Sequence, residues 1–250
     1  MARRARQYSQ TGLYHIIYRG INRQNIFEED SDYTTMANII YDLKLEMKFA
    51  IYAYCFMTNH AHLLLREGNM GDISTIMKRL LTKYAGWFNR KYERSGTLFA
   101  NRYKSQPVEN DEYLLSVVRY IHQNPIKANV AINLGDYKWS SYPEYLNKGI
   151  LTDTQFILSM IDKKGFEEFH QEEDKELHEV SDRIGRSEEY IRRRIITLMD
   201  GKEPHEISAL PKDERNKIIK QLRTEEGFSI RQVERATGIS RGIIANVEIS

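Results

Sequence analysis

The sequence predicts an α+β fold, in which helices pack on one face of a mainly antiparallel sheet and a small all-helical region follows. Short apolar stretches rich in Tyr, Ile and Leu are typical of buried strands. Between them lie longer stretches whose apolar residues recur at helical spacing. After residue 180 the pattern is helical throughout. Strands and helices that alternate in this way favour an α+β sandwich.

The expected elements follow in order along the chain. Four strands are predicted, over residues 12–19, 51–57, 62–66 and 102–108, with the second and third joined as a hairpin at Thr58 and Asn59. Three helices are predicted, over residues 31–47, 72–89 and 110–124, and Pro125 is expected to end the third.

Composition indicates a soluble globular protein. The 250 residues are 41% hydrophobic and 29% charged, which is enough apolar material for a core. Cys55 is the single cysteine, so no internal disulfide is expected and a reducing cytoplasm fits. No apolar run approaches a membrane span, and Arg3, Arg4 and Arg6 are not followed by the apolar stretch of a signal peptide. We therefore expect a cytoplasmic protein with no membrane contact.

The charge distribution predicts three regions. The net charge is +6 over residues 1–150, −6 over residues 151–179 and +2 over residues 180–250. Together with the helical pattern this predicts a first domain over 1–147, an acidic helical connector over 148–179 and a helical DNA-binding domain over 180–250. Two nucleic-acid-facing modules would explain these charges, and so would ordinary surface scatter.

A pair of histidines begins the third predicted strand. His60 and His62 are two residues apart, so their side chains project from one strand face and can reach one metal ion. Tyr120 and Asn124 are four apart near the end of the third helix and share a helix face. His60, His62 and the Asn124 oxygen could therefore hold a divalent ion, Mg²⁺ or Mn²⁺, which accept such mixed nitrogen and oxygen ligands.

This set of residues suits phosphoryl transfer on DNA. A bound ion would polarise a substrate phosphate, and the Tyr120 hydroxyl would attack the phosphorus to form a covalent phosphotyrosine. The sequence offers no general base for Tyr120. His15 and His170 have no partner at ligand spacing, and His122 is interpreted as structural or adjacent to DNA. Tyr103 and Tyr113 are rival nucleophiles, but Tyr103 lies on a predicted strand and Tyr113 lacks an oxygen ligand four residues on.

These motifs resemble those of a known family. The Asn-His-Ala-His strand of residues 59–62, followed by Tyr-Ile-His-Gln-Asn-Pro at 120–125, is similar to the single-tyrosine HUH transposases of insertion sequences. Further segments are similar to the REP-associated tyrosine transposase branch, at residues 18–24, 96–99, 102–105 and 137–142. The resemblance implies a ferredoxin-like or RRM-like sheet and a metal-dependent enzyme that nicks and rejoins single-stranded DNA. It further implies a hairpin-forming repeat as substrate, beside a short guide tetranucleotide.

Several basic residues are candidates for DNA contact. Arginine and lysine side chains neutralise phosphates, a contact that gives affinity rather than sequence reading. The candidates in the first domain are Arg3, Arg4, Arg6, Arg19, Arg23, Arg102 and Lys104. Residues 227–244 are similar to a helix-turn-helix in which Gly238 makes the turn and Ser240 opens a recognition helix, with Arg241 and Asn246 as the DNA-facing candidates.

Two functions from different classes remain open. The first is the transposase, for which we expect a homodimer because one tyrosine per chain must handle two strand ends. The second is a non-catalytic, sequence-specific DNA-binding regulator that acts through its helix-turn-helix. No P-loop and no Gly-x-Gly-x-x-Gly motif is present, so no nucleotide cofactor is expected.

Overall fold

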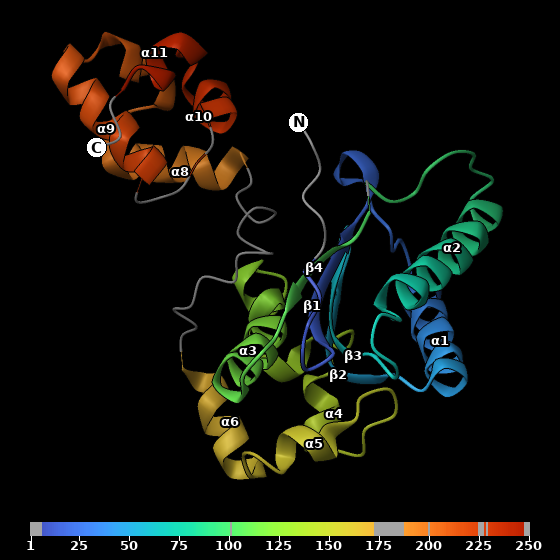
Figure 1. Cartoon of the computed structure of the whole chain (residues 1–250). Helices are drawn as coiled ribbons and strands as arrows, with labels where there is room; N and C mark the ends of the chain where they lie inside the picture. The colour runs from blue at the N-terminus through green and yellow to red at the C-terminus, as the bar shows by residue number, and fades with distance from the viewer. Residues whose placement is uncertain are drawn as a thin grey trace. The chain divides into compact units, whose positions relative to one another are not determined.

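The structure is a computed structural model that describes residues 7–100, 102–172, 188–199, 201–224, 228 and 230–247. The chain forms two compact units that divide after residue 181. Figure 1 shows the sheet and its helices in the first unit and a group of helices in the second.

The first unit is built on a four-stranded antiparallel sheet of order β2-β3-β1-β4. Its strands are β1 (Leu13–Arg19), β2 (Ala50–Met57), β3 (His60–Arg66) and β4 (Lys104–Pro107). The hairpin turn at Thr58 and Asn59 is confirmed. β4 is shorter than the sequence predicts, and β3 begins two residues earlier, so that both histidines of the pair are within the strand. The α+β class with an antiparallel sheet is confirmed.

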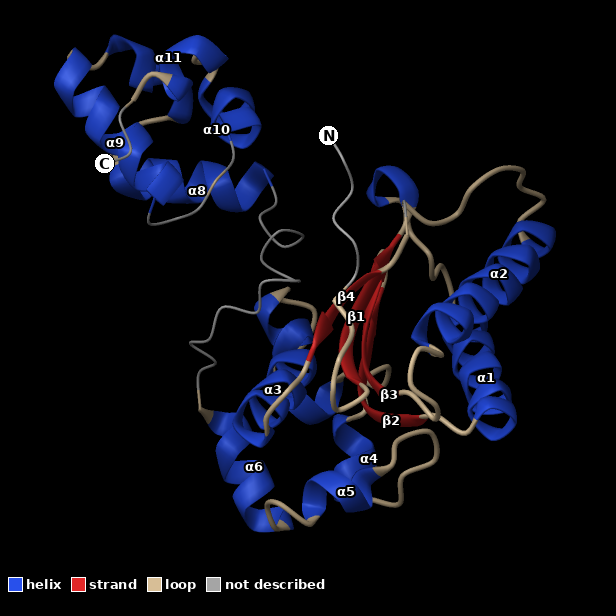
Figure 2. Cartoon of the chain, in the orientation of Figure 1, coloured by secondary structure: helices blue, strands red, loops and turns tan. Residues whose placement is uncertain are grey.

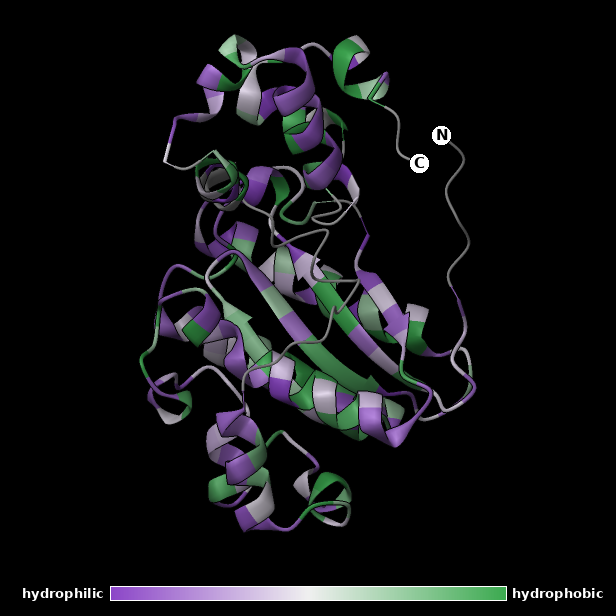
Figure 3. Ribbon diagram, turned by 90° about the vertical axis from the view of Figure 1, so that its left-hand side faces the viewer, coloured by the Kyte–Doolittle hydropathy of each residue, from purple (hydrophilic) through white to green (hydrophobic). Residues whose placement is uncertain are grey.

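Helices cover both faces of the sheet (Figure 2), so the expectation of one covered face is wrong. One face packs against α1 (Asp30–Met47) and α2 (Ile73–Lys91), and the other against α3 (Asp111–Lys127), α4 (Tyr142–Leu146), α5 (Thr154–Leu158) and α6 (Lys163–Gln171). Most residues of β1, β2 and β3 are buried, and Figure 3 shows green stretches along the strands that purple and white residues interrupt. On β1, Tyr14 and Ile16 face α1 and α2, whereas Leu13 lies in the other core. Burial on two faces needs a helical layer on each.

Helix α3 continues past the point where the sequence predicts its end. Asn110 caps it by accepting a hydrogen bond from the Tyr113 amide at 2.8 Å. Pro125 has no N–H to donate, but it lies in the last turn, and the helix runs on to Lys127. The Ala128 amide donates to the Asn124 carbonyl at 2.9 Å, so helical hydrogen bonding continues past Pro125.

The expected acidic connector belongs to the first unit as far as the structure describes it. Ile157 of α5 and Phe166 of α6 are buried in the core on the α3 face. The Asp153 amide donates to the Ile51 carbonyl at 2.7 Å, which ties this segment to β2. Short helices with apolar residues at helical spacing therefore pack on the sheet despite the acidic composition of the segment.

A chain of buried hydrogen bonds joins α3 to its neighbours. His170 Nδ1 bonds the Phe166 carbonyl at 2.8 Å, so its Nε2 accepts from His122 Nδ1 at 2.9 Å. His122 Nε2 then accepts from the Ser141 hydroxyl at 2.7 Å, and that hydroxyl oxygen accepts from the Tyr54 amide at 2.8 Å. The interpretation of His122 as structural agrees with these contacts.

The remaining elements are short 3-10 turns and the second unit. The turns η1 (Ile21–Arg23) and η2 (Leu134–Asp136) lie in the first unit. The second unit contains α8 (Glu188–Leu198), η3 (Pro204–Ala209), α9 (Lys212–Thr224), α10 (Ile230–Thr237) and α11 (Arg241–Ala245), which pack around an apolar core. Among the described residues, no helix is both long and apolar enough to cross a membrane.

The buried histidines predict a loss of stability in acid. Burial lowers the pKa of His170 to about 4, below its ordinary value of 6.5. Between these two values the unfolded chain binds a proton that the folded chain does not. We therefore expect the free energy of unfolding, measured by urea titration, to fall by about 1.4 kcal/mol per pH unit for this group as the pH drops from 6.5 toward 4.

His170→Gln should flatten this pH dependence, because glutamine can accept from His122 without titrating. His205→Gln serves as the control, since His205 is exposed in the second unit. Equal slopes for His170→Gln and the wild type would contradict the assignment.

Candidate active site on the α3 face of the sheet

The histidine pair lies on the sheet face that α3 covers. In the antiparallel register His60 is opposite Met57 and Arg19, and His62 is opposite Cys55 and Ile17. Residues directly opposite share a face, so this face carries both histidines and Arg19. His60 is half-buried and His62 is 2% exposed, and their ring centroids are 5.1 Å apart. At this separation both rings can contribute a nitrogen to one ion, since metal–nitrogen bonds are about 2.1 Å.

The surroundings of His60 favour its neutral form. Burial lowers the pKa of His60 to about 4, and the Arg19 cation adds to this effect. Its Nδ1 lies 2.7 Å from the Asn59 side-chain oxygen, and the Asn59 amide nitrogen donates to the Arg23 carbonyl at 3.4 Å. An oxygen acceptor at Nδ1 places the proton there and the lone pair on Nε2. A neutral imidazole with a defined tautomer is the form that binds metals.

His15 is a residue of this site that the sequence analysis missed. It is buried on β1, and its Nε2 lies 3.2 Å from Nδ1 of His62 with the rings stacked at 5.5 Å. If His62 donates from Nδ1 to His15, the Nε2 of His62 carries the lone pair. His15 has no partner at ligand spacing in the sequence, but the pairing of β1 with β3 brings it beside His62, which is 47 positions further along the chain. A histidine within an otherwise apolar strand was the signal available, since a buried imidazole needs a partner.

Tyr120 of α3 lies over the two buried histidines. Its ring centroid is 5.7 Å from that of His62 and 5.8 Å from that of His15, both edge-on. The Lys127 ammonium lies 4.7 Å from the centroid of the Tyr120 ring. A cation at this position stabilises the phenolate more than the phenol. The structure therefore brings together Tyr120, the histidine pair and a lysine that the sequence analysis did not single out.

Asn124 lies one helical turn after Tyr120, and its side-chain nitrogen donates to the Tyr120 carbonyl at 2.8 Å. This bond involves the nitrogen, so the side-chain oxygen is the atom that could ligate an ion. Within the described ranges there is no group of three His, Cys, Asp or Glu that could hold a metal. A third ligand of another type, such as this amide oxygen, is therefore what the two histidines require.

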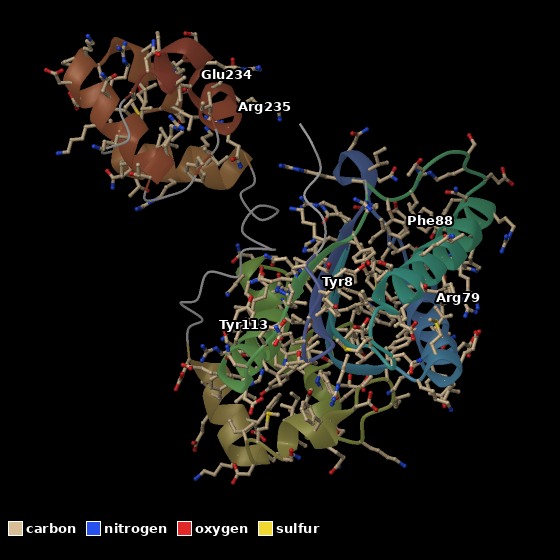
Figure 4. All side chains as sticks on the ribbon, viewed as in Figure 1. Tyr8, Arg79, Phe88, Tyr113, Glu234 and Arg235 are labelled. Carbon is tan, nitrogen blue, oxygen red and sulfur yellow. The ribbon has the colours of Figure 1, made fainter. Side chains whose placement is uncertain are left out.

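The rival tyrosines lie elsewhere. Tyr103 is buried in the core on the α1 and α2 face, opposite the histidines. Tyr113 lies near the start of α3 (Figure 4) and packs against the core on the α3 face, about two turns before Tyr120.

The predicted DNA contacts are divided among several places. Arg19 and the exposed Lys104 share the histidine face through the register of β1, and exposed Arg23 lies in η1. Exposed Arg102 precedes β4 and borders a groove beside α2. In the second unit the Arg241 side chain donates to Glu234 at 2.6 Å, and Asn246 directly follows α11. Arg3, Arg4 and Arg6 lie outside the described residues.

Residues 8–124 match the family model described as transposase IS200 like. These residues include the whole sheet, the histidine pair and α3 as far as Asn124, so the likeness to this family covers the sheet and the candidate site. The family expected from the sequence motifs is confirmed over this region.

One solved structure extends the likeness of fold to a larger part of the chain. A structure of a REP-associated tyrosine transposase bound to a REP hairpin is 20% identical, with a TM-score of 0.51, and the match covers 62% of this chain and 90% of that chain. A protein from Deinococcus radiodurans named as a candidate transposase is 18% identical, with 53% and 100% coverage, but its TM-score of 0.35 supports no comparison of fold. No curated protein matches the sequence.

The contact between His15 and His62 predicts a positioning role for His15. We expect His15→Phe to weaken Mn²⁺ binding by about 10–100-fold, because the acceptor that orients His62 is lost. Titration of Mn²⁺ monitored by electron paramagnetic resonance, without DNA, measures this directly. His15→Gln retains an acceptor and should recover part of the affinity. Wild-type Mn²⁺ affinity in a folded His15→Phe protein would show that His15 only packs.

Proposed function

We propose that the protein is a metal-dependent transposase that nicks and rejoins single-stranded DNA through a covalent phosphotyrosine at Tyr120. The observation that carries the proposal is the contact of the Tyr120 ring with His62 on one sheet face. His60, His62 and Asn124 would hold a divalent ion, Mg²⁺ or Mn²⁺. When bound, the ion would polarise the substrate phosphate and offset charge in the transition state.

The chain's own residues account for the remaining chemistry. The Tyr120 oxygen attacks the phosphorus, the bond to the 3′ oxygen of the neighbouring nucleotide breaks, and the 5′ phosphate stays on the tyrosine. Attack on this phosphotyrosine by a free 3′ hydroxyl rejoins a strand and releases the phenol. Arg19 and Lys104, on the same face, would contact the phosphates of the bound strand.

Lys127 supports the attack by Tyr120. Its ammonium lies over the phenol ring, where it stabilises the negative charge that develops on the nucleophile. A cation that favours the phenolate reduces the need for a dedicated general base.

The substrate class comes from the family. The similar REP-associated transposase was solved with a REP hairpin, and we propose hairpin-forming single-stranded repeats as the DNA of this protein too. A homodimer stays a prediction. Its basis is that each chain has one nucleophilic tyrosine, whereas a full strand exchange involves two strand ends. A cytoplasmic location likewise stays a prediction.

The second unit favours a further candidate function, sequence-specific DNA binding as a regulator. Its helices α10 and α11 are joined by a short turn in which Gly238 has a positive φ of 75°. Glu234 and Arg235 lie on α10 in Figure 4. The pairing of Arg241 with Glu234 would have to open for Arg241 to contact DNA.

Tyr120→Phe decides between these functions. Hairpin DNA from the regions flanking the gene, labelled and incubated with Mn²⁺ or with EDTA, should give a metal-dependent covalent adduct on a denaturing gel. Tyr120→Phe should abolish the adduct while the dissociation constant for DNA changes by no more than about threefold. Tyr113→Phe is the matched control and should retain the adduct. Tight DNA binding with no adduct in the presence of Mn²⁺ would favour the regulator.

The position of Lys127 predicts a change in rate and pH profile. Lys127→Gln should slow adduct formation about tenfold at neutral pH and shift its pH dependence upward, because the phenolate loses a stabilising cation. Lys127→Arg keeps the charge and should restore most of the rate. An unchanged pH profile in Lys127→Gln would indicate a packing role only.

A further inference from the structure

A groove of about 630 Å³ lies between α2 and the segment 96–103. Its apolar lining includes Met77 and Leu81 of α2, with Leu98 and Phe99 from the facing segment. The cores place α2 on the sheet face opposite the histidines. The volume is that of a small-molecule site, which makes the groove large enough for a nucleobase.

The walls of the groove are held in place without a ligand. The Asn89 side chain donates to the Gly96 carbonyl at 2.9 Å, and the Ser74 and Tyr103 hydroxyls lie 3.4 Å apart. The Ile21 amide also donates to the Leu98 carbonyl at 2.9 Å, which anchors the segment to the end of β1. A preformed groove binds without the cost of ordering its walls.

Gly86 lines the groove from the middle of α2. Glycine is unfavourable in a helix interior. A Cβ added there would meet only the Arg90 guanidinium, at 3.8 Å, so packing within the described residues does not require glycine. Because Gly86 has no side chain, the groove is open at this position.

The exposed basic residues that line the groove favour a negatively charged ligand. Lys78 and Arg102 are exposed members of its lining, which contains no carboxylate. A second hollow of about 240 Å³ shares Ser74 and Arg102 with the groove and extends to Tyr8, which is 73% exposed. Figure 4 shows Tyr8 on the first unit near the sheet. Apolar surface between cations, with an exposed aromatic ring beyond, is the pattern that binds single-stranded nucleic acid.

We infer that this groove is a second DNA subsite, which takes up an unpaired base of the single-stranded substrate while Lys78 and Arg102 contact the adjacent phosphates. The inference rests on the proposed function for the nature of the DNA. It adds a binding site on the sheet face opposite Tyr120, and it does not depend on the metal or on cleavage.

Gly86→Leu tests this by filling the groove. Affinities are measured in EDTA, so that no cleavage occurs, for a fluorescent single strand carrying all its bases and for an abasic strand of equal length. Gly86→Leu should bind the base-bearing strand about tenfold more weakly than the wild type and the abasic strand equally well. Thr75→Leu, an exposed position of α2 outside the groove lining, is the matched control and should bind both strands as the wild type does.

A second measurement locates the base directly. A strand with 5-iodouracil, irradiated on the full-length protein, should crosslink to the peptide containing Phe99 and Tyr103, and Gly86→Leu should lose this crosslink. The melting temperature of Gly86→Leu should equal or exceed that of the wild type, which separates blocking from unfolding.

Each remaining outcome overturns the inference. A folded Gly86→Leu protein with wild-type DNA affinity and wild-type crosslinking would exclude the subsite, and covalent adduct formation at Tyr120 would still stand as a separate result. A changed sedimentation coefficient with unchanged DNA affinity would identify the groove as a contact between two copies of the chain. Absence of any single-stranded DNA binding by the wild type would overturn this inference and the proposed function together.

Discussion

The pairing of β1 with β3 determines where the chemistry of this protein can lie. Side chains alternate along a strand, so His60 and His62 face α3 while Ala61 and Leu63 between and beside them face α1 and α2. A slip of one residue in this register would move the histidines into the opposite core. The same pairing brings His15 against His62. Both cores depend on this register, and so does the proposed metal site.

The buried hydrogen bonds of His122 complement this constraint. They connect α3 to Ser141 beside β2 and to His170 on α6, and each bond in the chain has a defined donor and acceptor. Tyr120 is two residues before His122 on the same helix. Hydrogen bonds that fix the rotation of α3 about its axis at His122 therefore also fix the direction of the Tyr120 side chain. The segment that the sequence marks as an acidic connector therefore helps to orient the proposed nucleophile.

The proposed catalytic face and the groove beside α2 lie on opposite sides of one thin sheet. The strand β4 is its edge: Lys104 shares the face of the histidines, and Arg102 just before it lines the groove. A single strand of DNA bound at both places would cross this edge. Such an arrangement would hold the DNA on both sides of the cleavage point, and positioning of this kind contributes much of the rate in phosphoryl transfer.

The sequence by itself determined the local features of this protein. Periodicity and capping residues located the strands and helices, and the motif around His60, His62, Tyr120 and Asn124 indicated the family, because these signals reside in neighbouring residues. Only the tertiary structure decided which distant residues meet. His15 joins His62, Lys127 covers Tyr120, α6 packs on α3, and helices occupy both sheet faces, because register and helix packing depend on contacts between residues far apart in the chain.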